Sequence, residues 1–497
     1  ATDVYNTAVG FSAGNAVTTG VSNTLIGGLA GDALTDADNN VAVGKEALST
    51  DTLGSRSVAI GTAALFTQNF TSATDAYNTA VGHFAGGSVT TGTLNTFVGG
   101  LAGDALTVGG SNVSLGYFSL TADTKGSKSV AVGTAALGDQ NFTSATDAFN
   151  VAIGQEAGRS VTTGIKNTFI GGLSGDATTD ADFNVGVGHN TLTTNVLGSR
   201  SVAVGYTALE AQNPASAVDM YNTAVGHAAG FAVTTGTENT LIGGAAGDAL
   251  TTANANTAVG RLTLTNETSA NGSTAIGSEA LKNQNVGGGG DARNTAVGLL
   301  AGVNISTGIK NVILGSRAGD ALTDADSNIA IGESALSTDT LGSKSVAIGD
   351  SALYTQNFTS ATDTYNVAVG FSAGNGITTG VNNTLIGGRA ADALTTGFNN
   401  TAVGEEALSA DTRGNRNTAI GVAALANQNF TSDTDSNNTA VGSRAGVEVT
   451  TGINNTLIGA STGDALTDAD ANVAVGVGAL GADTLGSKTV AIGRICI

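Results

Sequence analysis

One short phrase returns along the whole chain at a fixed spacing, and it ends each time in glycine. It reads YNTAVG at residues 5–10, 77–82 and 221–226. The glycines that close it lie 72 residues apart, at Gly10, Gly82, Gly154, Gly226, Gly298, Gly370 and Gly442. Self-similarity at a fixed period predicts an array of like units, each stacked on its neighbours. We therefore divide one continuous domain, 1–497, into the repeats 1–72, 73–144, 145–216, 217–288, 289–360, 361–432 and 433–497.

Each repeat contains the phrase four times in weaker form. In the first repeat the four versions are NTAVG, NTLIG, NVAVG and SVAIG, which end at Gly10, Gly27, Gly44 and Gly61. The steps between these glycines are 17 residues each, and 21 residues separate Gly61 from the first glycine of the next repeat. Seven repeats of four phrases therefore predict a stack of 28 rungs.

The residue before the closing glycine is Val or Ile in 26 of the 28 rungs, as at Val9, Ile26, Val43 and Ile60. β-Branched side chains favour strands, and the apolar residues of each phrase alternate with period two. Five-residue strands that return every 17 to 21 residues, without helical stretches between them, predict an all-β parallel β-solenoid. A doubly wound α/β fold needs crossover helices and is excluded.

Two polar or small residue types hold constant slots in the phrase. The closing glycine permits a positive φ or a close approach of stacked backbones. Asparagine opens many strands, as at Asn6, Asn23 and Asn40. Stacked Asn side chains form hydrogen-bonded ladders in other parallel stacks, so we expect these residues to be structural.

Both faces of each predicted strand are apolar. In the fourth rung Val58 and Ile60 share one face and Ala59 lies on the other, where each repeat also places one larger residue, such as Phe97. Strands that are apolar on both faces are buried on both faces. One face lines the solenoid interior, and the other is covered by the same coil or by further copies of the chain. We favour a homotrimer over a monomeric rod.

Charge and composition exclude several classes of partner. The chain has 40 acidic and 19 basic residues, a net charge of −21. That excess repels nucleic acid and anionic lipid, and no apolar run is long enough to insert directly into a membrane. Cys496 is the only cysteine, so no disulfide forms within the chain.

Pairs of aspartates in the odd-numbered repeats are the candidate metal ligands. They are Asp36 and Asp38, Asp180 and Asp182, Asp324 and Asp326, and Asp468 and Asp470. Carboxylates among oxygen-bearing neighbours suit Ca²⁺. The alternative is an acidic, solvated turn, and the GGxGxD pattern of calcium-binding β-rolls is absent. No other cofactor is expected.

Nothing in the sequence indicates catalysis, because almost every polar group recurs with the repeat. His83, His189 and His227 each follow a closing glycine, and we interpret them as solvated surface residues. Threonine pairs such as 18–19 recur only at every fourth rung, whereas an ice-binding face needs threonine on every rung. A solenoid that binds calcium or ice is accordingly only a remote alternative function. Tyrosines share one slot before the strand, where we expect stacking rather than sugar binding: Tyr5, Tyr77, Tyr221 and Tyr365.

The phrases NTAVGxxAG, NTLIGGxAGDAL and SVAIGxxAL resemble the head repeats of YadA-like trimeric autotransporter adhesins, and equally the repeats of phage tail-fibre shafts. The resemblance covers all 28 rungs. It implies a left-handed parallel β-roll, a homotrimer, an extracellular location at a cell or virion surface, and a role in attachment.

We therefore expect a non-enzymatic structural protein, a rigid shaft or filament subunit of a surface appendage, adhesin or fibre. Its expected partners are further copies of itself, as a homotrimer or an end-to-end filament, and a host or neighbouring cell surface. The alternative is a host-binding adhesin head or tail-fibre module, in which variable turn residues carry the binding. An enzyme on a β-helix would need a groove of non-repeated acids and bases, and the sequence contains none.

Overall fold

The computed structural model describes residues 3–496, and in this range every regular element is a β-strand. The strands pair in parallel, and the pattern repeats about every 17 residues. The prediction of an all-β parallel β-solenoid is therefore confirmed. The chain divides into two compact units, Ala1–Thr252 and Ala253–Ile497. Each unit has the same construction, and the two are described in turn.

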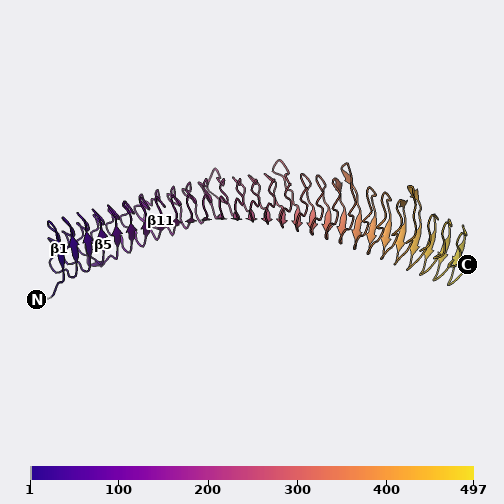
Figure 1. Cartoon of the computed structure of the whole chain (residues 1–497), viewed down its shortest axis with the longest axis horizontal. Coiled ribbons are helices and arrows are strands. Elements are labelled where there is room, and N and C mark those ends of the chain that lie inside the picture. Colours follow the sequence, from indigo (N-terminus) through magenta and orange to yellow (C-terminus); the bar gives the residue numbers. More distant parts are fainter. Residues whose placement is uncertain (1–2, 497) are drawn as a thin grey trace. The chain divides into compact units, whose positions relative to one another are not determined.

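Unit 1 contributes fourteen three-residue strands to a parallel sheet, and Figure 1 shows them side by side with their turns on one side. They are β1 (Thr7–Val9), β2 (Thr24–Ile26), β3 (Val41–Val43), β5 (Val58–Ile60), β7 (Thr79–Val81), β8 (Thr96–Val98), β9 (Val113–Leu115), β11 (Val130–Val132), β13 (Val151–Ile153), β14 (Thr168–Ile170), β15 (Val185–Val187), β17 (Val202–Val204), β19 (Thr223–Val225) and β20 (Thr240–Ile242).

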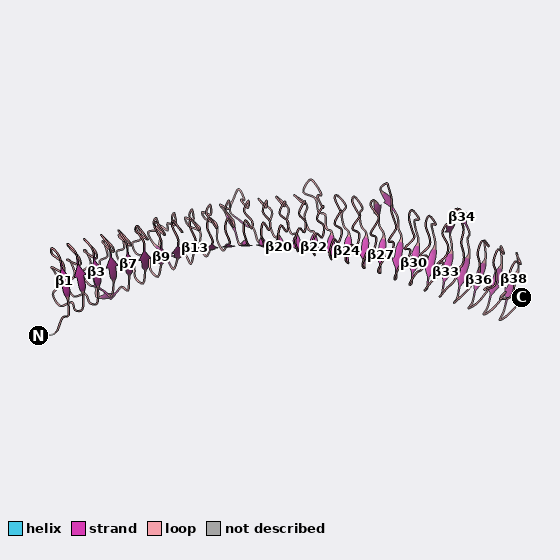
Figure 2. Ribbon diagram, viewed as in Figure 1, coloured by secondary structure: helices cyan, strands magenta, loops and turns pink. Residues whose placement is uncertain are grey.

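Unit 2 also contributes fourteen such strands (Figure 2). They are β21 (Thr257–Val259), β22 (Thr274–Ile276), β23 (Thr295–Val297), β24 (Val312–Leu314), β25 (Ile329–Ile331), β27 (Val346–Ile348), β29 (Val367–Val369), β30 (Thr384–Ile386), β31 (Thr401–Val403), β33 (Thr418–Ile420), β35 (Thr439–Val441), β36 (Thr456–Ile458), β37 (Val473–Val475) and β38 (Val490–Ile492).

Equivalent positions of the phrase stack on one another along the main strands, and in many pairs the residues are the same or similar. Between β3 and β5, Val41 pairs with Val58 and Ala42 with Ala59. The strands are three residues long, so the expected length of five residues was wrong. Before most strands an Asn carboxamide of the preceding coil replaces the ladder carbonyl, as where the Asn40 N–H donates to Asn23 Oδ1 (2.9 Å). After it, the closing glycine leaves the extended conformation, and Gly27 has a φ of +138°.

Hydrogen bonds between rungs continue around the turns. The N–H of Thr18 donates to the carbonyl of Thr35 (3.0 Å), and that of Gly31 donates to Ala47 (2.9 Å). Each coil is therefore tied to the next around most of its circumference, although only three residues of each 17-residue coil form a regular strand.

The interior is filled by the small face of the strands and by the turns of the same coils. Ala42 and Ala59 are fully buried, and Leu25 is buried as the larger residue of that column. Leu34 and Leu48 close the core from the turn side. The same coil therefore covers the alanine face, and no further copy of the chain is needed for that purpose.

Each 21-residue step forms a longer loop, and at five of the six steps a second, short strand pair joins this loop to the preceding coil. At the remaining step an isolated bridge between Asn271 and Asp291 does so. In unit 1 the pairs are β4 (Gly54–Ser55) with β6 (Thr74–Asp75), β10 (Gly126–Ser127) with β12 (Thr146–Asp147), and β16 (Gly198–Ser199) with β18 (Val218–Asp219). In unit 2 they are β26 (Gly342–Ser343) with β28 (Thr362–Asp363), and β32 (Gly414–Asn415) with β34 (Thr434–Asp435). Figure 2 shows β34 out on its loop, away from the main strands.

Candidate functional site

In each unit, the outward face of the main sheet is a double column of branched apolar or threonine side chains. The first residue of every main strand is Thr, Val or Ile, and the third is Val, Ile or Leu. The middle residues are buried in every main strand except β1, where Ala8 is exposed, whereas Ile26 and Ile60 are 39% and 37% exposed. No coil of the same chain covers this face in the described residues. We call these two columns the outer stripe; a contiguous uncharged surface of this kind is typical of an interaction site.

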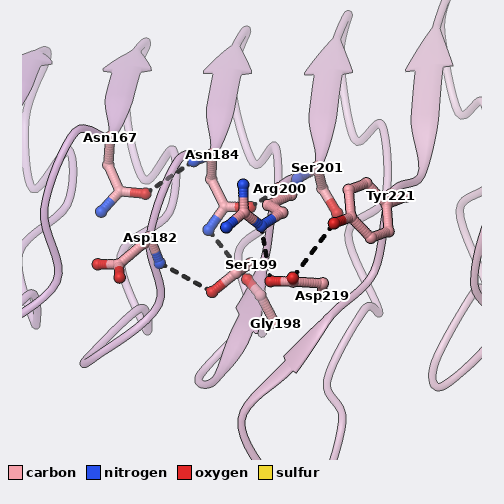
Figure 3. Close-up of polar contacts among 9 residues, drawn as sticks. All are labelled: Asn167, Asp182, Asn184, Gly198, Ser199, Arg200, Ser201, Asp219 and Tyr221. Atoms are coloured by element: carbon pink, nitrogen blue, oxygen red, sulfur yellow. Dashed lines mark hydrogen bonds and ion pairs between the residues drawn. The ribbon is translucent and has the colours of Figure 1, made fainter.

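A ladder of buried asparagines runs beside the strands, and Figure 3 shows one part of it. The N–H of Asn184 donates to Asn167 Oδ1 (2.9 Å), and the Asn184 amide nitrogen donates to the Gly198 carbonyl (2.9 Å). Asn6, Asn23 and Asn40 make the same contacts in the first repeat. Each carboxamide therefore bonds both an N–H and a carbonyl of the next coil, so these residues are structural.

A glutamine continues the ladder where serine interrupts it at the 21-residue step, a feature that the sequence analysis missed. Gln68 Nε2 donates to Ser57 Oγ (3.0 Å) and to Asp51 Oδ2 (2.5 Å), and Gln68 Oε1 accepts from Asn78 (2.8 Å). Burial raises the pKa of Asp51, and it does the same for Asp411. The signal was the recurrence of a Gln-Asn pair at 72-residue spacing, as at residues 68–69 and 140–141.

The aspartates that the sequence offers as calcium ligands accept hydrogen bonds from the preceding coil. Asp36 Oδ1 accepts from the Thr19 hydroxyl, and Asp38 Oδ1 accepts from the Val21 N–H (2.8 Å). The same two bonds hold the three other pairs, Asp180 and Asp182, Asp324 and Asp326, and Asp468 and Asp470. Among the described residues, no group of three or more His, Cys, Asp or Glu side chains is placed to hold a metal ion.

Ion pairs and aromatic rings tether the longer loops. Arg200 Nε lies 2.9 Å from Asp219 Oδ1, and the Tyr221 hydroxyl donates to Asp219 Oδ2 (3.3 Å; Figure 3). The guanidinium also lies over the rings of Phe183 and Tyr221, at 4.8 and 6.0 Å from their centroids. The tyrosine slot therefore stacks on the basic residue of the neighbouring coil.

Two of the three histidines lie closer together than their separation in sequence indicates. His189 and His227 stack on opposite sides of Tyr206. His83 lies elsewhere in unit 1, with its ring centroid 6.4 Å from that of Phe84. The threonine pair at 18–19 bonds the next coil through both hydroxyls.

No described segment forms a helix with the length and apolar character needed to cross a membrane. No protein-family model matches the chain, and no curated protein matches it.

Proposed function

We propose that the chain is a structural β-solenoid, the shaft or filament subunit of a surface appendage, which associates with further copies of itself through the outer stripe. The observation that carries the proposal is the regularity of this stripe. Thirteen of the fourteen rungs in each unit present a β-branched pair on this face, the exceptions ending in Leu115 and Leu314, and no charged residue interrupts either column. The turn slots on the same coils vary widely, as Lys45, Thr62 and Tyr117 show.

Burial of the outer stripe contributes to the proposed association. Completing the burial of a side chain as exposed as Ile26 yields about 1 kcal/mol, since full burial of Ile contributes roughly 1.5–3 kcal/mol. Many stripe residues are less exposed than Ile26 or are threonine, so the gain summed over both columns of one unit is on the order of 10 kcal/mol, which is similar in size to the roughly 4–15 kcal/mol of lost translational and rotational freedom. We propose three chains because the repeat phrases resemble the head repeats of trimeric adhesins.

Light scattering coupled to size exclusion tests the proposal. We expect particles of three times the 48.3 kDa chain mass. The variant Ile420→Lys places a charge in the outer stripe and should lower the mass toward one chain, with an unchanged circular dichroism spectrum. Val422→Lys is the matched control, because Val422 lies two residues further on in an exposed turn. A single-chain mass for the native protein, or equal effects of both variants, contradicts the proposal.

We also propose a location outside the cell, on a cell or virion surface, and attachment to a host surface through the turn residues. The repeat phrases support this part through their resemblance to adhesin heads and fibre shafts. Accessibility of the native protein to protease added to intact producing cells or virions tests the location. Protection from the protease, lost only on lysis, contradicts it.

A further inference from the structure

Three consecutive coils of unit 1 carry rings in the slot that follows the closing glycine. The rings are those of His189, Tyr206 and His227, and the sequence contains no other such run of three. Their centroids are 5.9 and 5.5 Å apart, and the planes are inclined by only 18° and 19°. The three side chains therefore form a stack along the solenoid surface.

The two ends of this stack differ. The slots beyond it hold glycines, Gly172 next to His189 and Gly244 next to His227. A Cβ on Gly172 would lie 3.4 Å from His189 Cδ2, so the ring lies over that backbone. A Cβ on Gly244 would meet nothing within 4 Å. The face of His227 that points away from Tyr206 therefore borders an unfilled slot.

A surface pocket of about 450 Å³ adjoins this position. Its lining includes the rings of Tyr206, His227 and Phe231, and the carboxylates of Glu210 and Asp248. Asp248 belongs to the same coil as Gly244. No Lys or Arg lines the pocket. One carboxylate oxygen of Asp248 is buried without a hydrogen-bond partner in the structure, as is one oxygen of Asp32 and of Asp176 in the equivalent slots of the first and third repeats.

Rings together with carboxylates select a positively charged ligand. Aromatic faces attract cations through their quadrupole, and ammonium groups are held in this way in aromatic cages. We propose that this pocket binds the ammonium group of a small organic cation, placed against the rings of Tyr206, His227 and Phe231 and neutralised by Glu210 and Asp248.

The equivalent pocket one repeat earlier also has rings and a carboxylate, from Tyr117, Phe118 and Asp139, but it differs in charge. Arg159 stands there 72 residues before Phe231, and Gly138 before Glu210. Arg159 already provides a cation, paired with Glu156 at 3.3 Å. Of these two pockets, only that of residues 190–248 therefore combines rings and two carboxylates without a basic side chain in its lining.

Calorimetry of the full chain with choline tests the site, with the neutral carbon isostere of choline as the control ligand and ethanolamine as a primary ammonium. We expect choline or ethanolamine to bind and the neutral isostere not to bind. The histidine ring signals in ¹H–¹³C spectra should shift for His227, while His83 serves as the internal reference. Equal binding of choline and its isostere, or no binding by either ammonium compound, overturns the proposal.

Substitutions separate the pocket from the fold. Phe231→Ala removes one ring of the pocket and should weaken ammonium binding at least tenfold, as should Glu210→Gln. Phe371→Ala is the control, because Phe371 is also an exposed ring but does not line the pocket. Native binding by Phe231→Ala, or equal loss in Phe371→Ala, refutes the assignment.

Discussion

At the scale of single residues, the closing glycines combine two constraints that no other residue satisfies. Gly27 has a φ of +138°, in a region that L side chains rarely adopt, and an added Cβ would lie 2.4 Å from the Gly44 carbonyl oxygen. The next residue, Gly28, has neither constraint. Adjacent glycines in the same coil therefore have different roles, and only the first is required by the stack.

We predict that Gly27→Ala destabilises its coil by about 3 kcal/mol or more, because strain and the backbone clash add. Gly28→Ala should change stability by less than about 1 kcal/mol. Native-state hydrogen exchange of the amides in residues 24–44 measures both effects locally. Equal protection in the two variants would show that the close approach of Gly27 to Gly44 is unimportant.

Buried Asp51 and Asp411 make stability depend on pH, because burial raises the pKa of each carboxyl above its unfolded value. A raised folded pKa means that the folded state binds the proton more tightly. The contribution is therefore full at acidic pH and is lost as pH rises through the folded pKa. Asn already occupies the equivalent position in the third repeat, as Asn195.

We predict that the double variant Asp51→Asn, Asp411→Asn loses less stability than the native chain between pH 4 and pH 7. Urea unfolding at a series of pH values measures the difference. Parallel pH profiles for the two proteins would contradict the prediction. In the third repeat, Asn195 stands at the position of Asp51, and Gln212 Nε2 is buried there without a hydrogen-bond partner. That coil is the structural reference for the variant.

At the scale of the element, a coil is held by buried amides more than by its exposed ion pairs. Asn184 is fully buried and bonds two neighbouring coils. Arg200 and Asp219 form an ion pair whose side chains are 42% and 44% exposed. Removing a buried hydrogen-bonding partner costs roughly 1–3 kcal/mol, whereas an exposed ion pair contributes about 0–1 kcal/mol.

Asn184→Ala should therefore accelerate exchange of the amides of β15 and β17 far more than Arg200→Ala does. Arg200→Ala should instead act mainly on the loop that β18 joins to its coil, because Arg200 contacts Asp219 and Tyr221 there. Exchange mass spectrometry on both variants resolves the two regions. A larger effect of Arg200→Ala on β17 would mean that the tether, and not the ladder, holds the coil.

At the scale of the whole molecule, the chain combines an uncharged outer stripe with a strongly acidic set of other residues. The net charge of −21 makes copies of the chain repel one another at long range. In the association that we propose, the outer stripe attracts at contact through burial of apolar surface. The proposed association then depends on the balance between a screened repulsion and an attraction that salt does not screen.

We predict that salt strengthens self-association. The Debye length is about 10 Å at 0.1 M salt and about 3 Å at 1 M, so repulsion between copies weakens while burial of the stripe does not. Sedimentation velocity at fixed protein concentration should show more associated chain at the higher salt. Dissociation on adding salt would indicate that ion pairs, and not the stripe, join the copies.

The repeat in the sequence was enough to predict the class of fold, the rung spacing and the roles of glycine and asparagine. These features follow from local preferences that recur in every coil: a β-branched slot such as Val43, a glycine such as Gly44, and an amide such as Asn40. Because every coil repeats the same local preferences, the class of fold can be predicted without knowledge of long-range contacts.

The tertiary structure alone decided which apolar face points inward and which distant residues meet. Alternation with period two does not by itself show which face of a strand is buried. In the structure the turns of each coil cover the face of Ala42 and Ala59, whereas Ile60 lies on the exposed face. The 21-residue step brings Gln68 to Asp51. Stacking also places Tyr206 between His189 and His227. Such contacts depend on how coils of unequal length are superposed, which no local preference specifies.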